Sequence, residues 1–319
     1  MRKNFRVWLV VALSLILLGG IVFVVALACC GWDFARLDTA EYQTMTYQIE
    51  AVEEISICVE TADVRVAASE NGERKVVCYE RESAQHTVEI SEGKLGIEVV
   101  DNRKWYEHLF SFGRDAITVY LPEEEYSSLT IQTDTGDVEV SHKFLFGSVE
   151  ISSDTGDIKC VASASGKMRL ASSTGDLEIA GASMAELQIS VSTGRVVVAD
   201  VQCAGSLSVG VSTGETYLAN VACEGFTTGG GTGDVVIKDL LASGKLFIER
   251  GTGDVILESS DAAELYIKTG TGDVNGTLRS AKVFSVTTGT GHVSVPHGTT
   301  GGKCEIKTGT GDVRIRIVE

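Results

Sequence analysis

The feature that most constrains the fold is a short repeat that runs from about residue 129 to residue 319. A Thr-Gly pair recurs ten times, at intervals of 19 or 20 residues. The pairs are Thr135 and Gly136, Thr155 and Gly156, Thr174 and Gly175, Thr193 and Gly194, Thr213 and Gly214, Thr232 and Gly233, Thr252 and Gly253, Thr271 and Gly272, Thr290 and Gly291, and Thr310 and Gly311. Such a period is typical of repeat architectures, in which each unit buries its apolar face against its neighbours.

Apolar and polar residues alternate on both sides of each Thr-Gly pair. The second position after the glycine is aliphatic in every copy except the one with Thr216, and the fifth position before it is aliphatic except at Thr228. This alternation is the period of a half-buried strand. Each repeat is therefore predicted to be a strand, a Thr-Gly corner, a second strand and a less regular third side.

Two architectures have this pattern, a chain of β-hairpins and a β-solenoid. The favoured two-residue hairpin turns need positive φ, and the β-branched threonine resists that conformation. An extended threonine followed by a glycine free to turn left-handed suits a corner between stacked strands. We therefore expect an all-β, parallel β-solenoid of about ten coils at residues 129–319. The octapeptide IKTGTGDV occurs at both 267–274 and 306–313, as expected where neighbouring coils share stacking constraints.

The N-terminal segment has a different composition. Residues 7–32 are uncharged and apolar, which is long enough for a transmembrane helix. Basic residues precede the run and acidic residues follow it, which predicts a cytoplasmic N-terminus (1–6), an anchor (7–30), a linker (31–44) and an exported remainder. A cleaved signal peptide ending at the A-L-A of residues 26–28, or a lipid-modified Cys29, are alternatives that also export the remainder.

The net charge limits which classes of partner the chain can bind, and the cysteine pattern limits which metal or redox sites it can form. The formal charge of −17 disfavours nucleic acid and anionic polymers as partners. The eight cysteines form no C-x-x-C pair, so the usual zinc and redox signatures are missing. Cys203 and Cys223 each lie nine residues after a repeat glycine. They are predicted to stack, either as a disulfide or as two buried thiols.

An aspartate follows the corner glycine in seven of the ten copies. One interpretation is a ladder of Ca²⁺ ligands, with Asp234, Asp254 and Asp273 as the candidates. The other is that each carboxylate accepts a backbone N–H at its corner. The second is favoured, because Arg195 and His292 interrupt the row and the Ca²⁺-binding nonapeptide is absent. No cofactor is expected.

Enzymatic chemistry is not indicated. The five histidines are scattered, and no nucleophile elbow, metal-spaced pair or phosphate-binding loop occurs. Ser-Thr-Gly, as at residues 173–175, is a corner and not a nucleophile. We therefore predict no catalytic residues and a non-enzymatic protein.

Residues 45–128 are predicted to form degenerate capping coils, because TADVRV at 61–66 echoes T-G-D-V. Within them lies an aromatic group made of Trp105, Tyr106, Phe110 and Phe112. It is either a loop that binds a partner or contacts the membrane, or a segment that covers the first coil. At the other end, Arg314 and Arg316 lie on the last strand, where charge would discourage strand addition to a terminal edge.

The segment ITVYLPEEEYSSLTIQTDTGDVEV at 117–140, the recurring T-G-D-V and the preceding apolar segment resemble a bacterial family of adhesin-like β-repeat proteins of unknown function, which includes LiaG-like envelope proteins. The resemblance covers about residues 40–319. It implies a single-stranded, right-handed β-solenoid on the cell surface, connected with adhesion or envelope stress. It supplies no catalytic residues.

The leading hypothesis is a single-pass protein of the cell membrane with an extracellular solenoid, whose flat faces bind an envelope polymer or a membrane protein. Two alternatives remain open. One is a surface enzyme that acts on polysaccharide, which would gather carboxylates and a base on one face. The other is a Ca²⁺-stabilised stalk.

Overall fold

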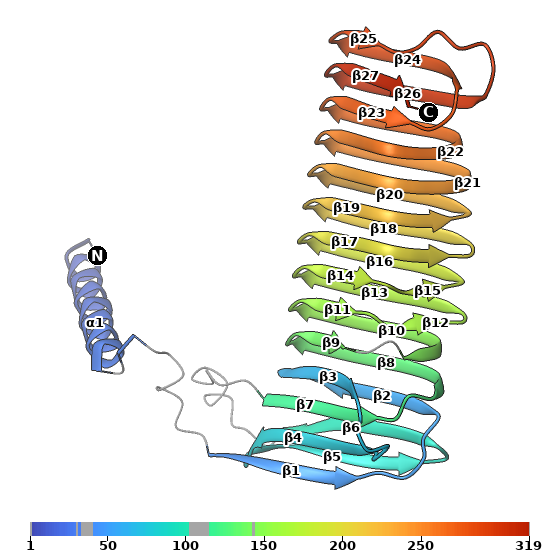
Figure 1. Ribbon diagram of the computed structural model, residues 1–319. Helices are drawn as coiled ribbons and strands as arrows, with labels where there is room; N and C mark the ends of the chain where they lie inside the picture. The colour runs from blue at the N-terminus through green and yellow to red at the C-terminus, as the bar shows by residue number, and fades with distance from the viewer. Residues whose placement is uncertain (1, 30, 33–40, 102–114, 142–143, 319) are drawn as a thin grey trace.

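A computed structural model describes residues 2–29, 31–32, 41–101, 115–141 and 144–318 (Figure 1). One helix, α1 (Arg2–Cys29), precedes a tall stack of strands. Seven strands form the N-terminal part of the stack: β1 (Tyr42–Gln48), β2 (Glu54–Val59), β3 (Ala62–Ala68), β4 (Lys75–Arg81), β5 (Ala84–Ser91), β6 (Lys94–Asp101) and β7 (Asp115–Leu121). The described part of the chain is all-β apart from α1.

Twenty further strands build the repeat region. They are β8 (Glu125–Thr135), β9 (Val138–Val140), β10 (Leu145–Thr155), β11 (Ile158–Cys160), β12 (Ser163–Ala164), β13 (Lys167–Thr174), β14 (Leu177–Ala180), β15 (Ser183–Met184), β16 (Glu186–Thr193), β17 (Val196–Cys203), β18 (Ser206–Thr213), β19 (Thr216–Cys223), β20 (Gly225–Thr232), β21 (Val235–Thr252), β22 (Val255–Thr271), β23 (Val274–Leu278), β24 (Lys282–Thr290), β25 (Val293–Ser294), β26 (Gly302–Thr310) and β27 (Val313–Ile317).

These strands form a parallel β-solenoid of about nine turns, as the repeat predicted. The strand before each corner stacks on its counterpart in the next turn, as β8, β10, β13 and β16 do. The strand after each corner stacks likewise, as β9, β11, β14 and β17 do. Corresponding residues pair in register, so the corner threonines form one column along the stack.

The alternating aliphatic residues form the core. Ile131, Ile151, Leu170 and Ile189 occupy one column and are each no more than 1% exposed. Full burial of such a side chain stabilises the fold by about 1.5–3 kcal/mol. The core runs through the whole stack as one continuous cluster, so each turn depends on its neighbours.

A second corner lies six residues after the corner glycine in five successive turns. Gly181, Asp200, Asn220, Asp239 and Ser259 have φ values of 64°, 54°, 52°, 51° and 46°, in the left-handed region. Asn and Asp tolerate this region better than other non-glycine residues. The Nδ2 of Asn220 also donates to Oδ1 of Asp200 at 2.6 Å. The repeat pattern predicts a less regular third side, whereas the structure shows a regular column of left-handed residues there.

Stacking order departs from chain order at both ends. The turn β2–β3 lies between β6–β7 and β8–β9, with parallel pairing on both sides. At the other end, β26–β27 lie between β22–β23 and β24–β25. The interpretation that Arg314 protects a terminal edge is therefore wrong, because Arg314 pairs with Asn275 of β23 and with Ser294 of β25. Arg316 pairs with Thr277 of β23, and the pairing with β25 ends at Arg314. The terminal turn is β24–β25.

The N-terminal end carries antiparallel strands. β4 pairs antiparallel with β1 and β7, and β5 pairs antiparallel with β6. Residues 42–101 and 115–121 therefore combine the solenoid-like turn β2–β3 with antiparallel strands that cover this end of the stack. The segment with Trp105, Tyr106, Phe110 and Phe112 lies outside the described residues.

Candidate functional site

The Thr-Gly corner is a close-packed backbone column. The ten corner glycines have φ values between 128° and 152°. A Cβ on Gly156 would lie 2.1 Å from the carbonyl oxygen of Gly136 in the turn below. Both the φ value and the close approach require glycine, so this column holds adjacent turns together.

The aspartates after the corner glycines bind the backbone of the next turn. Oδ1 of Asp234 accepts the N–H of Asp254 at 2.8 Å, and Oδ1 of Asp254 accepts the N–H of Asp273 at 2.8 Å. Oδ1 of Asp273 accepts the N–H of Asp312 at 2.7 Å. The donor is therefore in the neighbouring turn, not in the same corner. These bonds give the carboxylates a structural role without a cation.

Shallow grooves follow the third side of the solenoid. One, of about 600 Å³, is lined by small or flexible side chains that include Ala164, Met184, Cys203 and Cys223. A second, of about 480 Å³, continues past Cys223. The pairing of Gln202 with Ala222 places Cys203 next to Cys223. Both are buried free thiols, and burial raises the pKa of Cys223 to about 12. A disulfide between them stays a prediction.

Arg250 is the first in size among the fully buried side chains of the described residues, and it is 2% exposed. Its guanidinium donates to the carbonyl of Val211 at 2.8 Å and to the hydroxyl of Thr216 at 2.6 Å. A third contact, at 3.4 Å, reaches the hydroxyl of Thr228. The two threonines that interrupt the aliphatic columns thus both face Arg250. Burial lowers the pKa of this arginine.

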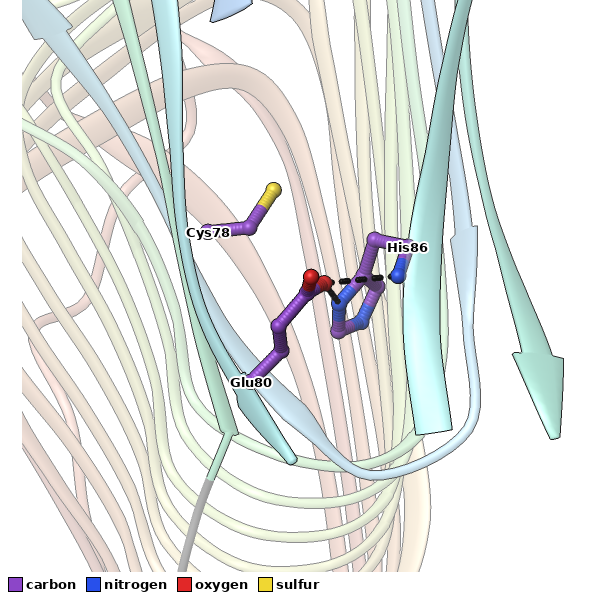
Figure 2. Close-up of side chains that lie close together, drawn as sticks. All are labelled: Cys78, Glu80 and His86. Carbon is purple, nitrogen blue, oxygen red and sulfur yellow. Dashed lines mark hydrogen bonds and ion pairs between the residues drawn. The ribbon is translucent and has the colours of Figure 1, made fainter. Parts of the chain in front are cut away.

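Three buried side chains of metal-ligating types lie together in the N-terminal cap (Figure 2). Cys78 and Glu80 share a face of β4, because alternate residues of a strand point the same way. His86 lies on β5. The three side chains are 0%, 1% and 3% exposed, and their ligand atoms all lie within 4.8 Å of one another. We call this group the cap cluster.

Glu80 is held firmly within the cap cluster. Its Oε2 accepts the backbone N–H of His86 at 2.7 Å and lies 2.9 Å from Nδ1 of the same residue. Burial, followed by the charge of Glu80, raises the pKa of the Cys78 thiol to about 12. The same two causes, with Cys78 as a third, raise the pKa of Tyr47 on β1. Without a cation, the thiol of Cys78 is therefore protonated at neutral pH.

A buried ion pair lies beside the cap cluster. Nε of Arg81 is 3.5 Å from Oδ1 of Asp115, and both side chains are almost fully buried. Arg81 follows Glu80 on β4, and Asp115 begins β7, which pairs with β4. The positive charge of Arg81 is thus balanced by its own partner.

The cap cluster is not predicted from the sequence, because Cys78 belongs to no C-x-x-C pair and His86 is one of five scattered histidines. The available signal was CYERESAQH at 78–86, in which Cys and Glu alternate on a predicted strand and a histidine follows. Only the antiparallel hairpin brings that histidine back to them.

Comparisons with known proteins identify a family. A family model described as Toastrack DUF4097 matches residues 52–215 and 200–319. Among curated proteins, no match was found.

Solved structures similar to the chain include two proteins described as "putative adhesin". One is from Bacteroides fragilis (12% identity, TM-score 0.42, covering 86% of this chain and 97% of that one). The other is from Parabacteroides distasonis (9% identity, TM-score 0.48, covering 86% and 98%). A third, from Parabacteroides distasonis, is described as a "putative lipid binding protein" (15% identity, TM-score 0.42, covering 88% and 98%). These TM-scores are all below 0.5, so the similarities give no information about the function of this chain.

Proposed function

This chain is a member of the Toastrack DUF4097 family, and from that premise we propose that it is a membrane-anchored, exported interaction module without enzymatic activity. In this proposal the solenoid binds an envelope polymer or a membrane protein and contributes to adhesion or envelope stress sensing. Three features of the molecule support it.

The first feature is α1. Residues Trp8–Cys29 form a helix long and apolar enough to cross a membrane, and its large apolar side chains are mostly exposed, as Trp8 at 72%, Ile16 at 74% and Val22 at 62% are. An exposed apolar surface of this size requires an apolar environment. With basic residues only at its N-terminal end, the helix favours a cytoplasmic N-terminus and an extracellular solenoid.

The second feature is the charge on the flat faces. Many charged side chains on these faces form an ion pair with a side chain of opposite charge in the adjacent turn. Examples are Lys159 with Glu178 at 3.5 Å and Lys268 with Glu249 at 2.7 Å. Exposed pairs of this kind contribute about 0–1 kcal/mol each. They neutralise one another along the faces, an arrangement that suits a soluble scaffold better than an acid–base site.

The third feature carries the proposal: the C-terminal end of the solenoid has an open edge. Among the described strands, β24 pairs only with β26, and β25 pairs only with β27. Val283 and Val293 are 41% and 47% exposed. β24 has no acidic residue, and its one charged residue, Lys282, is buried. An open, uncharged edge recruits an extended segment of a partner. The proposed binding surface is therefore this end, rather than the flat faces expected from the sequence.

The test uses the full chain in lipid nanodiscs. It is sedimented with isolated cell wall or with protein-containing membrane vesicles from the source cell. Val293→Lys places a charge at the open end, and Leu241→Lys is the matched control on the side of the stack, where Leu241 is 43% exposed. We expect Val293→Lys to weaken binding at least tenfold and Leu241→Lys to leave it unchanged. Equal binding by both variants would exclude the open end, and no binding to either material would overturn the interaction function.

A further inference from the structure

We propose that Cys78, Glu80 and His86 form a binding site for one divalent cation, Zn²⁺ or a cation of similar ligand preference. The proposal concerns the N-terminal cap and does not depend on the interaction function assigned to the other end of the solenoid.

The donor set is that of a zinc site. Zn²⁺ takes thiolate sulfur, imidazole nitrogen and carboxylate oxygen at about 2.0–2.3 Å, usually in a tetrahedron. Bonds of that length place neighbouring donor atoms about 3.3–3.8 Å apart. The three donor atoms of the cap cluster already lie within 4.8 Å of one another. Small side-chain rotations would bring them to the required spacing.

Charge supports the same conclusion. When a cation binds, Cys78 loses its proton, and the resulting thiolate and the carboxylate of Glu80 together neutralise a divalent cation in a buried place. Buried charges in proteins are usually paired or coordinate metals. The neighbouring cation, Arg81, lies 3.5 Å from Asp115, so its charge is already compensated and opposes a metal only weakly.

The backbone holds the donors in place. Cys78 and Glu80 lie on β4, which pairs with β1 on one side and β7 on the other. His86 lies two residues into β5, immediately after the turn from β4. Sites built on paired strands are more precise than sites on loops. In the proposed site, Nδ1 of His86 exchanges its contact with Glu80 for the cation, and water fills the fourth position.

No other group of this kind supports a cation among the described residues. The Asp carboxylates at the corners are engaged by backbone N–H groups. Cys203 and Cys223 have no histidine or carboxylate in the same close arrangement among the described residues. Cys223 is therefore a suitable control, since it is also a buried thiol.

The test is a titration of the full chain, in detergent and under reducing conditions, with Co²⁺ followed by Zn²⁺. A thiolate ligand gives Co²⁺ an intense charge-transfer absorption in the near ultraviolet, and tetrahedral coordination strengthens its visible bands. We expect both signals to saturate at one equivalent and to disappear on addition of Zn²⁺. Cys78→Ser should abolish the charge-transfer band, whereas Cys223→Ser should keep it.

Glu80→Gln and His86→Gln should weaken Co²⁺ binding at least tenfold. Circular dichroism of each variant checks that the strands remain folded. Thermal unfolding adds a second measurement, because a ligand that binds only the folded state raises the Tm. We expect Zn²⁺ to raise the Tm of the wild type and of Cys223→Ser, but not of folded cap-cluster variants. A charge-transfer band that persists in Cys78→Ser, or no band and no Tm shift in the wild type, would overturn the proposal.

Discussion

Ile267 and Ile306 lie directly opposite each other on β22 and β26, although 39 positions separate them in the sequence. They begin the two copies of IKTGTGDV, which run in register as far as Val274 and Val313. The complete turn β24–β25 lies between the copies in the chain but at the end of the stack in space. The identical segments are therefore physical neighbours, which face each other across one inter-turn interface.

Corner glycines should be intolerant of any side chain. In Gly272→Ala the new Cβ would lie 2.0 Å from the carbonyl oxygen of Gly253, at a φ of +151°. We expect a loss of about 2–4 kcal/mol in the free energy of unfolding, because the backbone is strained and the turns must separate. Gly229→Ala is the control, since its nearest atom is 3.9 Å away. Urea denaturation measures both, and equal effects would contradict the close-approach explanation.

The aspartate ladder should be independent of Ca²⁺. Asp254→Ala removes the acceptor for the N–H of Asp273 and should cost about 1 kcal/mol, whereas Asp254→Asn keeps an acceptor oxygen and should cost less. Thermal unfolding should give the same Tm with Ca²⁺ and with a chelator that removes it. If Ca²⁺ raised the Tm of the wild type but not that of Asp254→Ala, the result would instead favour the hypothesis of a Ca²⁺-stabilised stalk.

Substitutions of the same carboxylates also test the alternative hypothesis that the protein is an enzyme acting on polysaccharide. If Asp234, Asp254 and Asp273 served catalysis, their substitution would abolish a polysaccharide-cleaving activity and leave the Tm unchanged. We expect a different result: these substitutions lower the Tm, and neither the wild type nor the variants cleave polysaccharide.

Stability should fall in acid partly through Asp312. The backbone N–H of His292 donates to this carboxylate at 2.7 Å, and that bond, together with Arg314, lowers the pKa of Asp312 below its ordinary value of 3.8. A carboxyl with a lowered folded-state pKa contributes stability that is present above its unfolded pKa and is lost as the pH falls through the folded pKa. Asp312→Asn should therefore lose stability at pH 7 and differ less from the wild type at pH 2 than at pH 7. Denaturation curves that differ by the same amount at both pH values would contradict this assignment.

An apolar replacement of Arg250 should be tolerated only when Thr216 and Thr228 are replaced as well. Arg250→Leu leaves the hydroxyls of Thr216 and Thr228 without their guanidinium donor in the core, and we expect a loss of about 2–3 kcal/mol. The triple variant Arg250→Leu, Thr216→Val and Thr228→Val restores the aliphatic columns and should recover most of that loss. Chemical denaturation of both variants gives the comparison. If the triple variant were no more stable than Arg250→Leu, the loss in the free energy of unfolding would come from altered packing and not from the unpaired threonine hydroxyls.

The sequence by itself determined the local unit of this protein. A β-branched threonine before a glycine, with alternating aliphatic residues on either side, left a parallel solenoid as the consistent fold, because every turn obeys the same backbone and core constraints. The uncharged run before the repeat likewise indicated a single helix of membrane-spanning length, since length and polarity alone decide that property.

Tertiary structure decided what depends on contacts between distant segments. Turns with nearly identical sequences can stack in more than one order, so the repeat could not place β26–β27 inside the stack or β2–β3 between later strands. The partnership of Arg250 with two threonines from other turns follows from that stacking. The cap cluster depends on an antiparallel hairpin that turns His86 back against β4. Each of these arrangements is set by which backbones lie side by side, and sequence period carries no information about that choice.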